Sequence, residues 1–274
     1  MTKNRSYYRH VVNDSGYIVM TPNVGSEEDL LQSQPPNPYA ESATQQFPLG
    51  TKMIQGERVW RYCKNAANTV VIGAPLQSAA AVHADQNDDI VVNAATSSAI
   101  GSYTVTLTSD TDIDVAPWAT KNGGAEGYLF VNDATGEGQI YKIKEHEAFL
   151  TTGATIITLY DPLTIALVAG ASEVGLIQNP YSNIVVTAAP LTGMCVGVPL
   201  IPLSASYYFW SQTGGPAPVL ANTAIALGTA VVVGTTASKC DPEASETGEV
   251  LIGYPLTPLV TTSEYFPVFL TLDR

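Results

Sequence analysis

Residues 201–220 read IPLSASYYFWSQTGGPAPVL, a stretch with four consecutive aromatic side chains and no charge. The charge-free interval is longer still, because no Asp, Glu, Lys, Arg or His occurs from residue 174 to residue 238. Alternation along a β-strand sends Tyr207 and Phe209 to one face and Tyr208 and Trp210 to the other. Both faces of such a strand are aromatic, so each needs cover from the core or from a partner.

Two explanations compete for this interval: a two-sided core within the chain, or a surface between subunits. A half-buried strand turns every second residue toward solvent, and here the polar residues available for that half are Ser, Thr, Gln, Asn and Gly. Charges are depleted at interface centres because desolvating an unpaired charge is costly. We therefore predict that Tyr207, Tyr208, Phe209 and Trp210 lie in or beside a homo-oligomer contact, with an intramolecular core as the alternative.

Short runs rich in Val, Ile, Thr and Tyr, separated by turn residues, predict an all-β barrel or sandwich. The expected strands are residues 104–109, 127–133, 138–144, 154–161, 183–188, 229–234 and 267–272. Gly56 stands where a hairpin turn needs a positive φ. We expect a body formed by residues 47–83 and 179–274, with an inserted β-rich subdomain at 84–178.

Residues 1–46 are polar, broken by proline and poor in apolar periodicity, so we expect an extended N-terminal arm. The one helix signal in the arm is GSEEDLLQSQ at 25–34, where Ser26 could serve as N-cap before PPNP ends the helix. The arm carries Lys3, Arg5 and Arg9 interleaved with Tyr7 and Tyr8. We interpret it as a contact segment; the alternative is a frayed terminus.

The composition of the 274-residue chain limits its partners. A net charge of −13 argues against nucleic-acid binding, which needs clustered Lys and Arg. The first residues, MTKNRSYYRHVV, lack the apolar core of a signal peptide, and no apolar run is long enough for a transmembrane helix. Cys63, Cys195 and Cys240 are odd in number and widely spaced, which predicts free, buried thiols made in a reducing compartment.

Two motifs, one of aspartates and one with a histidine, resemble metal-binding patterns but lack residues that those patterns require. Asp110, Asp112 and Asp114 alternate as calcium ligands can, but an EF-hand loop begun at Asp110 would need Gly and Glu where this chain has Val115 and Lys121. We expect the three carboxylates on one solvated strand face, with another kind of cation site as the alternative. The pair His146-Glu147 begins like HExxH, yet Leu150 occupies the place of the second histidine.

Two glycine-containing motifs also fall short of catalytic patterns. GASEVG at 170–175 lacks the second glycine of a nucleophile elbow, so we expect Ser172 to be a turn hydroxyl. GEGQ at 136–139 precedes a strand-like run, whereas a dinucleotide loop precedes a helix, so we expect a hairpin there. We predict no catalytic residue, no cofactor and no metal ligand, and hence not an enzyme.

Several blocks in order resemble virion structural proteins of tailed bacteriophages, notably head decoration proteins that stabilise capsids. The blocks are FPLGTKMIQGERVWRYCKNAANTVVIGAPL, GYLFVNDATGEGQIYKIKEH, SASYYFWSQTGGPAPVL and VLIGYPL. The resemblance covers most of residues 47–274, leaves 1–46 outside, and brings no catalytic residues with it. It implies a β-rich homo-oligomer, most often a trimer, on the outer surface of the capsid, made in the host cytoplasm and clamping neighbouring major capsid subunits.

On this resemblance the expected partners are the major capsid protein and further copies of this chain, with no nucleic acid and no membrane. The N-terminal arm is then the segment expected to reach over the capsid, through Lys3, Arg5, Tyr7, Tyr8 and Arg9. Two alternatives stay open: a tail or fibre component that contacts the host cell, and a carbohydrate-binding or glycan-degrading module.

Overall fold

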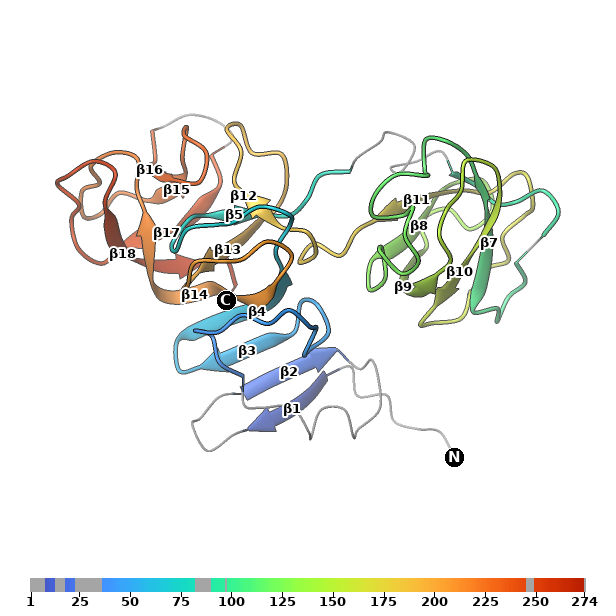
Figure 1. Ribbon diagram of the computed structural model, residues 1–274, viewed down its shortest axis with the longest axis horizontal. Coiled ribbons are helices and arrows are strands. Elements are labelled where there is room, and N and C mark those ends of the chain that lie inside the picture. Colours follow the sequence, from blue (N-terminus) through green and yellow to red (C-terminus); the bar gives the residue numbers. More distant parts are fainter. Residues whose placement is uncertain are drawn as a thin grey trace. The chain divides into compact units, whose positions relative to one another are not determined.

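The computed structural model describes residues 8–12, 18–22, 36–81, 90–96, 98–244 and 249–273, with the backbone alone for the first two ranges. Every regular element in these ranges is a β-strand, which confirms the all-β prediction (Figure 1). By its internal contacts the chain forms two compact units, residues 1–79 with 180–274 (unit 1) and residues 80–179 (unit 2). The described residues include no helix of the length and apolarity that crossing a bilayer requires.

Unit 2 is a six-stranded antiparallel sheet in the order β6-β11-β8-β9-β10-β7. Its strands are β6 (Ile90–Val91), β7 (Thr104–Ser109), β8 (Tyr128–Asp133), β9 (Ile140–His146), β10 (Gly153–Leu159) and β11 (Glu173–Ile177). Val92, directly after β6, bridges to Leu107 of β7, so the two ends of the order approach each other and the sheet is a nearly closed barrel. Alternate residues point inward to one core that includes Trp118, Leu129 and Phe149.

Unit 1 is a larger curled sheet in the order β1-β2-β3-β4-β14-β18-β17-β15-β16 (Figure 1). A branch leaves this order at β14, where β13 pairs with β14, β5 pairs with β13, and β12 pairs with β5. Its first strands are β1 (Tyr8–Val12), β2 (Ile18–Pro22), β3 (Lys52–Gln55), β4 (Arg58–Lys64) and β5 (Leu76–Gln77). The remainder are β12 (Val185–Val186), β13 (Cys195–Pro199), β14 (Tyr208–Leu220), β15 (Val231–Val233), β16 (Cys240–Pro242), β17 (Leu251–Pro255) and β18 (Tyr265–Thr271).

The long strand β14 organises unit 1 because it changes partner along its length. Its first half pairs with β4 and its second half pairs with β18, and a register shift separates Gln212 from Gly214. Gly215 has φ +75°, and a Cβ there would lie 2.5 Å from the carbonyl oxygen of Glu57. The buried Gln212 amide donates to the carbonyls of Gly214 and Pro216, both at 2.8 Å, and so holds the bend.

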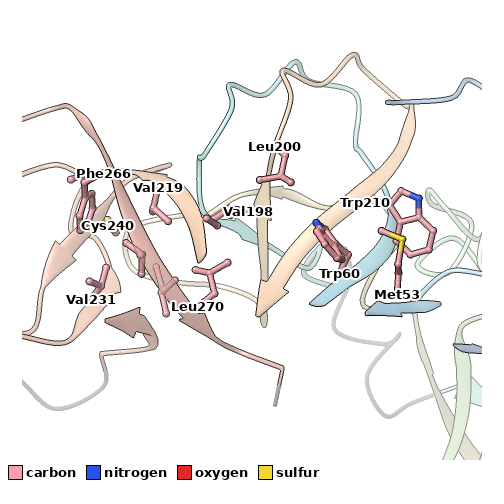
Figure 2. Close-up of a cluster of buried hydrophobic side chains, with 14 of the residues drawn as sticks. Met53, Trp60, Val198, Leu200, Trp210, Val219, Val231, Cys240, Phe266 and Leu270 are labelled. Atoms are coloured by element: carbon pink, nitrogen blue, oxygen red, sulfur yellow. The ribbon is translucent and has the colours of Figure 1, made fainter. Parts of the chain in front are cut away.

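Two apolar clusters fill unit 1, one on each side of the first half of β14. The larger contains Trp60, Trp210, Val219 and Phe266, and Figure 2 shows these side chains with their neighbours. The smaller contains Cys63, Leu76 and Phe209. Strand β14 is therefore covered on both sides at its start, while farther along one of its faces lies outside the core.

The predicted hairpin at Gly56 is confirmed, because β3 and β4 pair around it and its φ is +58°. The predicted arm is partly built into the fold instead of standing apart from it. Residues 8–12 and 18–22 form the hairpin β1-β2, and β2 pairs with β3. The helix signal at 25–34 lies outside the described residues.

Candidate functional site

The aromatic run at the start of β14 is mostly interior. Phe209 is 1% exposed and Trp210 is 3% exposed, and each belongs to a different core cluster of unit 1. The Trp210 ring lies 5.3 Å from the Phe47 ring and 5.1 Å from the Tyr62 ring. Strand alternation is as expected, but both faces are covered by the chain itself. We therefore assign Phe209 and Trp210 to the core, because neither has surface left for an oligomer contact.

Tyr207 and Tyr208 are half-buried. The Tyr208 ring stacks on Tyr62 with centroids 6.0 Å apart, and the Lys64 ammonium lies 5.5 Å from its centre. The backbone N–H of Tyr208 donates to Ser42 and its carbonyl accepts from the same residue, at 2.8 and 2.9 Å. Burial raises the pKa of the neighbouring Tyr62 to about 12. An oligomer contact at Tyr207 and Tyr208 stays a prediction.

An exposed apolar surface that includes part of the charge-free interval lies at the other end of β14. There Ala217 and Val219 enter the core, and the residues between them turn outward. The outward residues of β14, β17 and β18, with Leu256 just beyond β17, form what we term the outer apolar face. Its members are Pro216, Pro218, Leu220, Tyr254, Leu256, Tyr265, Pro267 and Phe269.

Strand register places the members of the outer apolar face in rows. Phe269 stands opposite Pro216 on one side and Tyr254 on the other. Pro267 stands opposite Pro218, and its carbonyl accepts the N–H of Leu256 at 2.9 Å. A third row pairs Leu220 with Tyr265. A hollow of about 370 Å³ opens on this face between the prolines and Tyr265.

Of the five predicted contact residues of the arm, Tyr8 and Arg9 lie in a described strand. Lys3, Arg5 and Tyr7 lie outside the described residues. Tyr8 and Arg9 are in β1, where they pair with Pro22 and Thr21 of β2, and the description there is of the backbone. Their role on a capsid stays a prediction.

The three aspartates at 110–114 lie in turns after β7 and not on a strand face, which corrects that expectation. The Asp110 carboxylate accepts the N–H groups of Asp112 and Ile113 at 3.0 and 3.1 Å, so it stabilises the turn. Among the residues that the structure describes, His, Cys, Asp and Glu side chains nowhere gather in threes as a metal ion requires.

His146 is buried in unit 2 beside Trp118, with ring centroids 5.4 Å apart. Its Nε2 accepts the N–H of Gly124 at 2.9 Å, which leaves Nδ1 to donate to the Glu147 carbonyl at 2.7 Å. This pairing fixes the neutral tautomer, and burial lowers the pKa of the imidazole despite that hydrogen bond and the nearby Glu147. His146 is thus a satisfied core residue, while Leu150 is exposed.

The other motifs have structural roles. The Ser172 hydroxyl is buried, donates to the Thr135 carbonyl at 2.8 Å and accepts the N–H of Val168 at 3.0 Å, as expected of a turn hydroxyl. GEGQ lies in the turn between the antiparallel strands β8 and β9, as expected of a hairpin. All three cysteines are free; burial raises the pKa of Cys195 to about 11 and that of Cys240 to about 12.

A second hollow in unit 1, of about 510 Å³, is bordered by Asp241. The carboxylate of Asp241 is buried and accepts hydrogen bonds from the Thr235 N–H at 2.8 Å, the Thr235 hydroxyl at 2.9 Å and the Thr223 hydroxyl at 3.1 Å. These donors satisfy the charge from within the chain. Asp241 therefore anchors the turn between β15 and β16, and we assign it no ligand.

Comparison of the chain with known protein families, with curated proteins and with solved structures finds no match. The outer apolar face is therefore the feature of the described residues from which we argue function.

Proposed function

We propose that the chain is a non-enzymatic decoration protein of a tailed-bacteriophage head. In this proposal it binds the outside of the assembled capsid as an oligomer and stabilises contacts between major capsid subunits. The supports are the sequence resemblance of residues 47–274 and one structural observation, the outer apolar face on an otherwise acidic chain. An uncharged exposed face of this size is typical of a surface that another protein covers.

A decoration protein acts by binding alone and needs no catalytic residues. A protein that binds the assembled lattice and not the free subunits stabilises the lattice by mass action. Oligomers that engage several lattice points gain avidity, so each contact can be modest. The net charge of −13 also keeps an outer protein from adhering to packaged or released DNA.

The test is quantification of the chain in purified particles of the virus that encodes it. We expect a copy number close to that of the major capsid protein, and no chain in isolated tails. Adding purified protein to heads that lack it should raise the temperature at which the heads release DNA. A low copy number confined to tails, with adsorption of the purified protein to host cells, would instead identify a tail or fibre component. Binding to a glycan array without binding to heads would identify a carbohydrate-binding module.

A further inference from the structure

The outer apolar face is continuous across three neighbouring strands and contains no charged side chain. Tyr254 is 46% exposed, Tyr265 is 45% exposed and Phe269 is 37% exposed. Phe269 is the middle member of a cross-strand row, with Pro216 and Tyr254 on either side. These side chains therefore form one surface and not scattered exposed residues.

The face is also rigid. Three of its eight members are prolines, whose side chains lose little conformational entropy on binding, and the aromatic rings rotate about only two bonds. The residues between them, Val219, Phe266 and Leu270, are buried on the other side of the same strands, where Figure 2 shows them in the core. The backbone beneath the face is thus held by the core of unit 1. A preformed surface of this kind binds without a large ordering cost.

Its size suits a protein contact. Each exposed aromatic or leucine of the face offers roughly 80–100 Å², and the eight residues together offer about 500 Å². A stable interface buries about 800 Å² on each partner. The face alone thus supplies more than half of one side, and the polar residues around it can supply the rim.

Charge identifies the partner. Two copies of a chain with net charge −13 repel each other, so a contact between copies is least costly where neither presents a carboxylate. A basic partner would be bound through acidic residues, and this face has none. The apolar face without charge is the surface on which a second copy fits best.

We propose that a second copy of this chain covers the outer apolar face. This inference rests on the oligomeric part of the proposed function and names the surface that forms the oligomer. It moves the contact predicted from the sequence along β14, from the aromatic run at its start to the Pro216–Leu220 half. The apolar surface of β14, β17 and β18 then becomes the centre of an interface.

The test is sedimentation velocity of the purified full-length chain and of the variant Phe269→Glu. We expect the wild type to be oligomeric at micromolar concentration and the variant to dissociate, with a dissociation constant weakened by about 100-fold or more. The matched control is Ile156→Glu, which adds the same charge at an exposed apolar position of β10 in unit 2 and should leave the oligomer unchanged. Circular dichroism and thermal unfolding check that both variants fold.

A second variant keeps the inference testable if Phe269→Glu fails to fold. Tyr254→Ser with Tyr265→Ser removes exposed aromatic area without adding charge, and it should also weaken association. A wild type that stays monomeric at about 100 µM overturns the inference. So does an oligomer that persists in both face variants.

Head binding separates this inference from the proposed function. A monomeric wild type that still binds heads refutes the self-contact and the oligomeric part of the proposed function, but keeps the decoration role. An oligomer that dissociates as expected in the face variants, but never binds heads, supports the self-contact and refutes the function.

Discussion

Phe209→Ala separates the core assignment of the aromatic run from the interface prediction. Burying a phenylalanine ring of about 200 Å² at about 25 cal/mol per Å² is worth about 5 kcal/mol as an upper estimate. Measured Phe→Ala changes in cores cost about 3–5 kcal/mol, because a cavity remains. Phe209 is 1% exposed and belongs to the smaller apolar cluster of unit 1. We therefore expect Phe209→Ala to lower the free energy of unfolding by about 4 kcal/mol.

The assay is urea unfolding at low protein concentration, followed by tryptophan fluorescence. Trp60 and Trp210 report on unit 1, and the substitution removes neither. With a urea dependence of about 2 kcal/mol per M, the midpoint of the unit 1 transition should fall by about 2 M. The transition reported by Trp118 in unit 2 should not move.

Phe269→Ala is the matched control because it deletes the same ring from the outer apolar face. That ring is 37% exposed and its removal leaves no closed cavity, so we expect a cost of about 1–2 kcal/mol and a weakened oligomer. Refutation would be the reverse pattern. If Phe209→Ala dissociated the oligomer and moved the midpoint by less than about 0.5 M, the aromatic run would be an intersubunit contact after all.

Three further predictions concern titratable groups. Burial lowers the pKa of His146 below its value in the unfolded chain, so the unfolded state takes up a proton first as the pH falls. Unit 2 should therefore lose stability below about pH 6.5. In His146→Gln the unfolding transition reported by Trp118 should depend less on pH in that range. Burial by itself would raise the pKa of Asp273, but the hydrogen bonds from Arg61 outweigh it and the net pKa is lowered. Unit 1 should therefore hold this contribution above about pH 4 and lose it in more acid solution, and Asp273→Asn should cost about 1–2 kcal/mol in urea unfolding at pH 7. Cys63 and Cys240 are buried thiols, and burial raises the pKa of both, that of Cys240 to about 12. A thiol reagent at pH 8 should therefore modify them only as fast as the chain unfolds. Rapid labelling of the folded chain would contradict their burial.

Local pattern was sufficient for β7, β8, β9 and β10 of unit 2, whereas β6 and β11 were not predicted. Residues 104–109 alternate Thr with Val and Leu between turn signals, and they form β7 with those bounds. The hairpin at GEGQ followed from the same kind of reasoning, because glycine turns between β-branched runs have few other solutions.

The residues that pack over each face of a strand could not be predicted from the local sequence. The predicted alternation of Phe209 and Trp210 is confirmed, but a second core cluster on the far side of β14 forms from Cys63, Leu76 and other distant residues. Residues 8–12 and 18–22 belong to a segment expected to be too polar to fold alone, yet they pair with each other and β2 pairs with β3, which provides backbone hydrogen-bond partners.

The outer apolar face was also missed, although a signal for it exists. Pro216 and Pro218 argue against a strand, because proline lacks the N–H that a ladder uses. The segment 265–271, YFPVFLT, nevertheless has apolar residues at both alternating sets of positions, which indicates a strand covered on both faces. That two-sided pattern, joined to Pro216–Leu220 through strand pairing, would have located the face.

Strands β5 and β12 lie side by side, with Gln77 opposite Val185, and the whole of unit 2 is inserted between them. The chain therefore leaves unit 1 and re-enters it through neighbouring strands. A tight loop could join the two strand ends if unit 2 were cut out, and a foreign domain with closely spaced termini could be grafted in its place. The junction is thus a permissive position for engineering, where cargo can be exchanged while the sheet that carries it stays intact.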